Sequence, residues 1–86
     1  MIEVYYIPAI GESKVVKIEP TLKEYQKLVK GYIEKVEINA SDKVMIVNEE
    51  GLLEYKLPNQ AASAIASRHI VGDVFVIDRQ TFEEGG

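Results

Sequence analysis

The chain has 86 residues, of which 47% are hydrophobic and 28% are charged, and it contains no cysteine. This length and composition indicate one folded domain with a small core, and they exclude disulfides, thiol nucleophiles and cysteine-based metal sites. The net charge of −4 lies entirely in residues 44–86, since residues 1–43 hold seven lysines and seven acids. That sign is opposite to the one expected of a nucleic-acid-binding protein.

No apolar run approaches the roughly 20 residues of a membrane-spanning helix. The opening stretch, MIEVYYIPAI, lacks the basic region of a signal peptide. Together with the absence of cysteine, this favours a cytoplasmic location. The excess of lysine over arginine, eight to two, favours a thermophilic source.

Four segments of the first half read as strands, because β-branched and aromatic residues dominate them. They are residues 2–7, 13–19, 32–38 and 43–48. The tyrosine pair in the first segment, Tyr5 and Tyr6, must point to opposite faces of a sheet, so one ring is expected to be exposed.

A helix is predicted over residues 20–31, between the second and third strands. Thr21 and Glu24 have the spacing of a capping box, and Gly31 stands where a helix commonly ends in a left-handed residue. The apolar face of this helix consists of Leu22, Tyr25, Leu28 and Val29.

The second half is predicted to contain a strand, a short helix and a final strand. Residues 52–57 place Leu53, Tyr55 and Leu57 on one side of a strand, and residues 59–69 form a helix capped by Asn59. Residues 69–78 are apolar at nearly every position, which is typical of a central strand covered on both faces.

The predicted order is β-β-α-β-β-β-α-β, with short turns that favour antiparallel pairing. We therefore predict an α+β domain over residues 1–80, with a largely antiparallel sheet of about six strands and two short helices on one face. Residues 81–86 are predicted to be a polar C-terminal tail.

The densest group of polar residues is the stretch NEEG at positions 48–51. Asparagine at the first position and glycine at the fourth favour a turn, with both glutamates in solvent. A cation site that adds Asp73 or Glu34 is the alternative, although the alternating acids of a calcium-binding loop are missing. The predicted turn residues are Asn48, Glu49, Glu50 and Gly51.

The two strands around residues 39–42 must pair as a hairpin. Placing Ile38 opposite Val44 groups the apolar residues on one face and sets Glu34 opposite Asn48. We therefore predict a cross-strand hydrogen bond between Glu34 and Asn48. If this pair is instead a ligand site, Tyr32 lies on the same face.

A second candidate ligand site is the start of the helix predicted over residues 59–69. Its first turn contains no acid, so its free N–H groups could donate hydrogen bonds to an anion. The residues of this site are Asn59, Gln60 and Ala61. A water-capped helix end is the simpler alternative.

Catalytic chemistry finds little support in the sequence. His69 is the sole histidine, and its place at a predicted helix end suggests a structural role. The serines and threonines show no nucleophile motif, and the glycines form no phosphate-binding loop. We predict no catalytic residue, no metal site and no cofactor.

Four ordered motifs resemble a family of small phage, plasmid and viral proteins, domain of unknown function 3846. The motifs are GYIEKVEI at 31–38, VNEEG at 47–51, LPNQAA at 57–62 and IVGDVFVI at 70–77. The resemblance covers roughly residues 15–77 and implies a mobile-element origin without a mechanism. Its matching residues are Gly31, Tyr32, Ile33, Glu34, Asn48, Glu49, Gly51, Asn59, Gly72 and Asp73.

The leading hypothesis is a non-enzymatic accessory protein of a virus, phage or plasmid that binds a host protein or a small anionic ligand. A homodimer is also predicted, because sheet edges need cover. A nucleic-acid-associated regulator is the alternative, and a carboxylate-based hydrolase is a third. The regulator would need its lysines on one face: Lys14, Lys17, Lys23, Lys27, Lys30 and Lys35.

Overall fold

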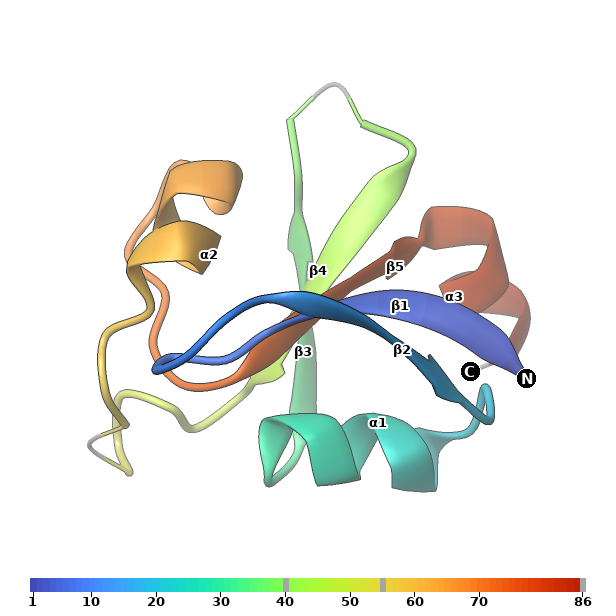
Figure 1. The fold of residues 1–86 in the computed structure, drawn as a ribbon, viewed down its shortest axis with the longest axis horizontal. Helices are drawn as coiled ribbons and strands as arrows, with labels where there is room; N and C mark the ends of the chain where they lie inside the picture. The colour runs from blue at the N-terminus through green and yellow to red at the C-terminus, as the bar shows by residue number, and fades with distance from the viewer. Residues whose placement is uncertain (40, 55, 86) are drawn as a thin grey trace.

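The computed structural model describes residues 1–39, 41–54 and 56–85, which form an antiparallel sheet flanked by short helices (Figure 1). The strand order is β2-β1-β5-β4-β3, and every neighbouring pair is antiparallel. The predicted α+β class is confirmed, with five strands and three helices in the described residues. In chain order the elements are β1 (Ile2–Ile7), β2 (Lys14–Ile18), α1 (Leu22–Val29), β3 (Ile33–Glu37), β4 (Lys43–Asn48), α2 (Gln60–Ala66), β5 (Val74–Asp78) and α3 (Arg79–Gly85).

Strand β5 is the central strand, as its apolar sequence predicted. Its first four residues are buried, because β1 and β4 flank it and helices cover parts of both faces. Such a strand needs apolar side chains at successive positions. It begins at Val74, later than predicted, because Gly72 takes a left-handed conformation (φ 79°) that interrupts the extended chain.

The helices α1 and α2 cover opposite faces of the sheet, whereas the sequence predicted both on one face (Figure 1). Alternate residues of β4 and β5 therefore enter two separate cores. The core under α1 contains Val4, Ile18, Tyr25, Val29, Val44, Ile46, Phe75 and Ile77. The core under α2 contains Ile7, Val36, Met45, Val47, Ala62, Ile70, Val74 and Val76.

The hairpin of β3 and β4 forms one residue away from the predicted register. Glu34 lies opposite Val47, and Ile33 lies opposite Asn48. Glu34 and Asn48 are therefore on different faces of the sheet, and the predicted hydrogen bond between them is wrong. Every residue of β4 after the first is buried, so β4 has apolar side chains on both faces. Either register would therefore place apolar side chains of β4 on the same face as those of β3, and the hydrophobic pattern could not choose between the two.

Helix α1 begins at the predicted cap but ends differently. The Thr21 hydroxyl accepts a hydrogen bond from the Glu24 N–H at 3.3 Å. The second half of the capping box does not form within the described residues, because the Thr21 N–H donates to the Glu19 carbonyl oxygen at 2.9 Å, and the Glu24 carboxylate instead pairs with Lys27 at 3.1 Å. At the other end Lys30, and not Gly31, takes the left-handed conformation (φ 63°).

The described residues of this segment, 52–54 and 56–57, do not form the predicted strand. Backbone hydrogen bonds close a chain reversal there: Gly51 N–H to Asn48 O at 3.2 Å, and Glu54 N–H to Glu50 O at 2.9 Å. The predicted turn at residues 48–51 is confirmed, and Glu49 and Glu50 are exposed. Strand pairing would have to break these local bonds. The predicted orientation of Tyr55 lies outside the described residues.

The segment after β5 forms helix α3 where the sequence suggested a polar tail. Phe82 packs against Tyr25 of α1 with 5.6 Å between ring centroids. Arg79 pairs with Glu37 of β3 and donates to the Ser41 carbonyl oxygen at 3.1 Å. A seven-residue helix is not stable alone, so it depends on the surface that α1 and the sheet provide.

Candidate functional site at the loop end of the sheet

The motifs singled out in the sequence meet at one end of the sheet. Antiparallel pairing brings the ends of β1 and β4 beside the starts of β3 and β5, and α1 also ends there (Figure 1). We call this region the loop end; it comprises residues 8–13, 30–32, 49–54 and 67–73. Residues distant in sequence are thereby adjacent.

Asn48 is buried at the loop end and joins β4 to the end of α1. Its side-chain N–H₂ group donates to the carbonyl oxygens of Val29 (3.1 Å) and Lys30 (3.3 Å), and its oxygen accepts from the Glu50 N–H (2.7 Å). A Cβ atom added at Gly31 would lie 2.5 Å from this nitrogen. Gly31 is therefore required by space, and Asn48 satisfies helix carbonyls that would otherwise lack donors.

Glu34 and Tyr32, which were predicted to share a site with Asn48, form no hydrogen bond with its side chain within the described residues. Glu34 projects from the other face of β3 into solvent. Tyr32 is exposed and borders a hollow of about 200 Å³ with Gln26, Gly31, Glu50 and Glu54. The structure therefore does not bring these three side chains together.

Asn59 joins the end of β1, the start of α2 and the segment that precedes β5. It is completely buried and donates to the carbonyl oxygens of Ile7 (2.9 Å) and Gly72 (2.8 Å). Its side-chain oxygen accepts from the Ala62 N–H at 3.0 Å, so it caps α2 as predicted. This bond occupies one of the N–H groups that the predicted anion site required, while Gln60 and Ala61 face solvent.

Asp73 makes polar contacts with three different segments at the loop end. Its carboxylate accepts from the Ala9 N–H (2.9 Å) and the Tyr6 hydroxyl (3.1 Å) and pairs with Lys30 (3.0 Å). Burial opposes ionisation, but these donors outweigh it and lower the pKa of Asp73. Burial, followed by the negative charge of Asp73, raises the pKa of Tyr6, and the bond to Asp73 raises that of Lys30.

We expect Asp73 to make the protein less stable in acid. Because its pKa is lower in the folded chain, its stabilisation is complete above the ordinary value of about 3.9 and is lost as the pH falls below it. Asp73→Asn should cost roughly 1–3 kcal/mol at pH 7. Urea unfolding at pH 7 and pH 3 should show this deficit shrinking in acid.

The exposed Asp42, which forms no ion pair within the described residues, provides the matched control. Asp42→Asn should change stability by less than about 0.5 kcal/mol at both pH values. A deficit of Asp73→Asn that is equally large at pH 3 would contradict the assigned role of the carboxylate.

A groove of about 290 Å³ runs between the 49–54 turn and the segment that follows α2. Its floor includes the buried Val36, Val47 and Ile70. The turn contributes Leu52 and Leu53, which are 67% and 77% exposed. We call this feature the leucine groove.

Three charged side chains and one histidine line the rim of the leucine groove: Glu34, Glu49, Arg68 and His69. None of the four forms an ion pair within the described residues. His69 does not end a helix as predicted, since α2 ends at Ala66 and His69 is exposed beyond it. The sequence indicated no role for Arg68. The groove could have been suspected only from the two adjacent leucines that follow the glycine of the turn.

The described residues contain no group of three or more histidine, aspartate or glutamate side chains arranged to hold a metal ion. No helix in that part of the chain is both long and apolar enough to span a membrane. The lining of the leucine groove combines apolar side chains with charges of both signs.

Comparison with protein families matches residues 2–85 to the domain of unknown function DUF3846. The match extends beyond the motifs noted in the sequence and includes β1 and α3. Comparisons with curated proteins and with solved structures give no match. Because the family model covers nearly the whole chain, the protein belongs to the DUF3846 family.

Proposed function

We propose that this chain is a non-enzymatic accessory protein of a virus, phage or plasmid, and that it binds a host protein through the leucine groove. The origin rests on the ordered motifs, and the mode of action rests on the geometry of the groove. The main support for this mode of action is that two adjacent leucines, Leu52 and Leu53, are exposed beside the apolar floor of the groove.

The turn holds these leucines away from the protein core. Backbone hydrogen bonds at residues 48–51 and 50–54 anchor the chain on both sides of Leu52 and Leu53. A Cβ atom at Gly51 would lie 2.8 Å from the Val71 side chain, so the turn sits close against the segment after α2. Exposing a leucine forgoes about 1.5–3 kcal/mol of burial, and contiguous exposed apolar surface marks interaction sites.

Charge favours a protein partner over a nucleic acid. Helix α1 and its C-cap carry three lysines, Lys23, Lys27 and Lys30. Two of them already form ion pairs, Lys27 with Glu24 and Lys30 with Asp73. The groove rim adds two carboxylates, which would repel phosphates. Opposite charges on one rim instead suit a protein surface that carries both signs.

Site-specific cross-linking tests this proposal. A photoreactive phenylalanine analogue at position 53 should form a discrete adduct with one host protein in living cells. Leu52→Ser with Leu53→Ser should weaken the purified complex at least about tenfold, because anchoring side chains dominate interface energies. Protein stability should change by less than about 1 kcal/mol, since both side chains are exposed.

Ile10 is the matched control, because it is a large exposed apolar residue (74%) in the β1–β2 connection. Ile10→Ser should leave the complex unchanged, and the photoreactive residue at position 10 should give no adduct. Identical adducts from both positions, or unchanged affinity of the leucine double variant, would refute binding through this groove.

A further inference from the structure

Helix α2 leaves part of its face of the sheet uncovered. One cross-strand row on this face contains Val15, Tyr5, Val76, Met45 and Val36. Met45 and Val36 are buried, whereas Tyr5 is 43% and Val15 is 59% exposed. A helix of seven residues is roughly 10 Å long, about half the width of five strands, so α2 cannot cover the whole row.

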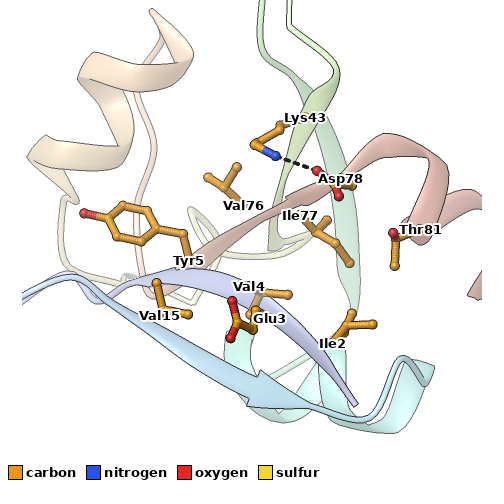
Figure 2. A pocket seen from close by; sticks show the side chains of 10 residues that line it. All are labelled: Ile2, Glu3, Val4, Tyr5, Val15, Lys43, Val76, Ile77, Asp78 and Thr81. Atoms are coloured by element: carbon orange, nitrogen blue, oxygen red, sulfur yellow. Dashed lines mark hydrogen bonds and ion pairs between the residues drawn. The ribbon is translucent and has the colours of Figure 1, made fainter.

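The uncovered part forms a hollow of about 530 Å³ (Figure 2). Tyr5 and Val15 lie at one side of it, Val76 lies between them and β4, and Asp78 with Lys43 lies at the far side. Glu3 points from β1 into the same region, two residues from Tyr5 along the strand. We call this surface the open face; it consists of Glu3, Tyr5, Val15, Val76 and Asp78.

The charge of the open face is negative. A second hollow of about 300 Å³ adjoins it and shares Asp78 and Thr81. Asp78 pairs with Lys43, but Glu3 forms no ion pair within the described residues, although Lys17 lies opposite it on β2. Together the two hollows are lined by four carboxylates, Glu3, Asp42, Asp78 and Glu84, and by two cations, Lys43 and Arg79.

We propose that the open face docks a basic segment of a partner protein, separately from the leucine groove. Apolar side chains of that segment pack on Tyr5, Val15 and Val76, and a lysine or arginine reaches Glu3. The segment extends the cover that α2 provides over the rest of the same face. Its positive charge complements the excess of carboxylates at this end of the sheet.

Other occupants fit these observations less well. A nucleic acid or an anionic membrane would meet the same carboxylates unfavourably. A second copy of this chain has a net charge of −4 and would bring further acid to an acidic surface. A basic protein segment satisfies both the apolar row and the charge.

Peptide titration followed by NMR tests the proposal. The probe is an acetylated and amidated octapeptide that alternates lysine and leucine, and its counterpart alternates glutamate and leucine. The basic peptide should shift the amide signals of residues 3–5, 14–17 and 76–78. Glu3→Lys should weaken this binding at least fivefold, and Tyr5→Ser should weaken it similarly.

Glu12→Lys is the control, because it makes the same charge change at an exposed position of the β1–β2 connection. It should weaken binding less than twofold, and the double variant of Leu52 and Leu53 should bind as the native chain does. Absence of shifts at millimolar peptide, equal binding of the acidic peptide, or equal effects of Glu3→Lys and Glu12→Lys would overturn the proposal. Self-association that Glu3→Lys abolishes would assign the surface to a second copy and overturn it as well.

Discussion

Replacing Asn59 by alanine is expected to destabilise the protein by about 3 kcal/mol or more. The change leaves the buried carbonyl oxygens of Ile7 and Gly72 without their donor and removes the cap of α2. Each unsatisfied buried group costs roughly 1–3 kcal/mol, and a lost cap costs about 1 kcal/mol.

Thermal unfolding measures this effect directly. For a domain of this size, 3 kcal/mol corresponds to a fall in Tm of more than about 10 °C. The control is Asn39→Ala, because Asn39 is exposed and its side chain forms no hydrogen bond within the described residues. Similar melting temperatures for the two variants would show that Asn59 does not hold these segments together.

Asn48→Asp should give a deficit in stability that depends on pH. The substitution keeps the shape of the side chain but removes the donor facing the Val29 and Lys30 carbonyl oxygens, and the Glu54 carboxylate lies 3.3 Å from the same nitrogen. The aspartate would keep the bond from the Glu50 N–H, but its second oxygen would face two carbonyl oxygens and a carboxylate in a buried position, which costs on the order of 3 kcal/mol. The new carboxyl group would therefore have a raised pKa in the folded chain.

The stability deficit of Asn48→Asp and the stability of the native protein are expected to change with pH for different reasons. A raised folded pKa means that the deficit is full at neutral pH and shrinks as the pH falls through that pKa toward the ordinary value of about 3.9. Native stability instead declines in acid as Asp73 is protonated. Urea unfolding from pH 7 to pH 4, with Asn39→Asp as control, should show this convergence; a constant deficit would refute it.

Local chemistry in the sequence was sufficient to predict several parts of the fold. The Thr21 cap, the turn at residues 48–51 and the cap at Asn59 each depend on a side chain that bonds to backbone a few residues away. The central position of β5 followed from a run that is apolar at nearly every position, which is typical of a strand covered on both faces.

Contacts between distant residues decided the rest. The register of β3 against β4 could not be derived, because α2 buries the face of β4 that α1 does not, and both faces are therefore apolar. Helix α3 depends on Tyr25, which is more than fifty residues before Phe82. The partners of Asn48 and Asp73 likewise come from other segments, and these long-range bonds, invisible to local pattern, define the loop end.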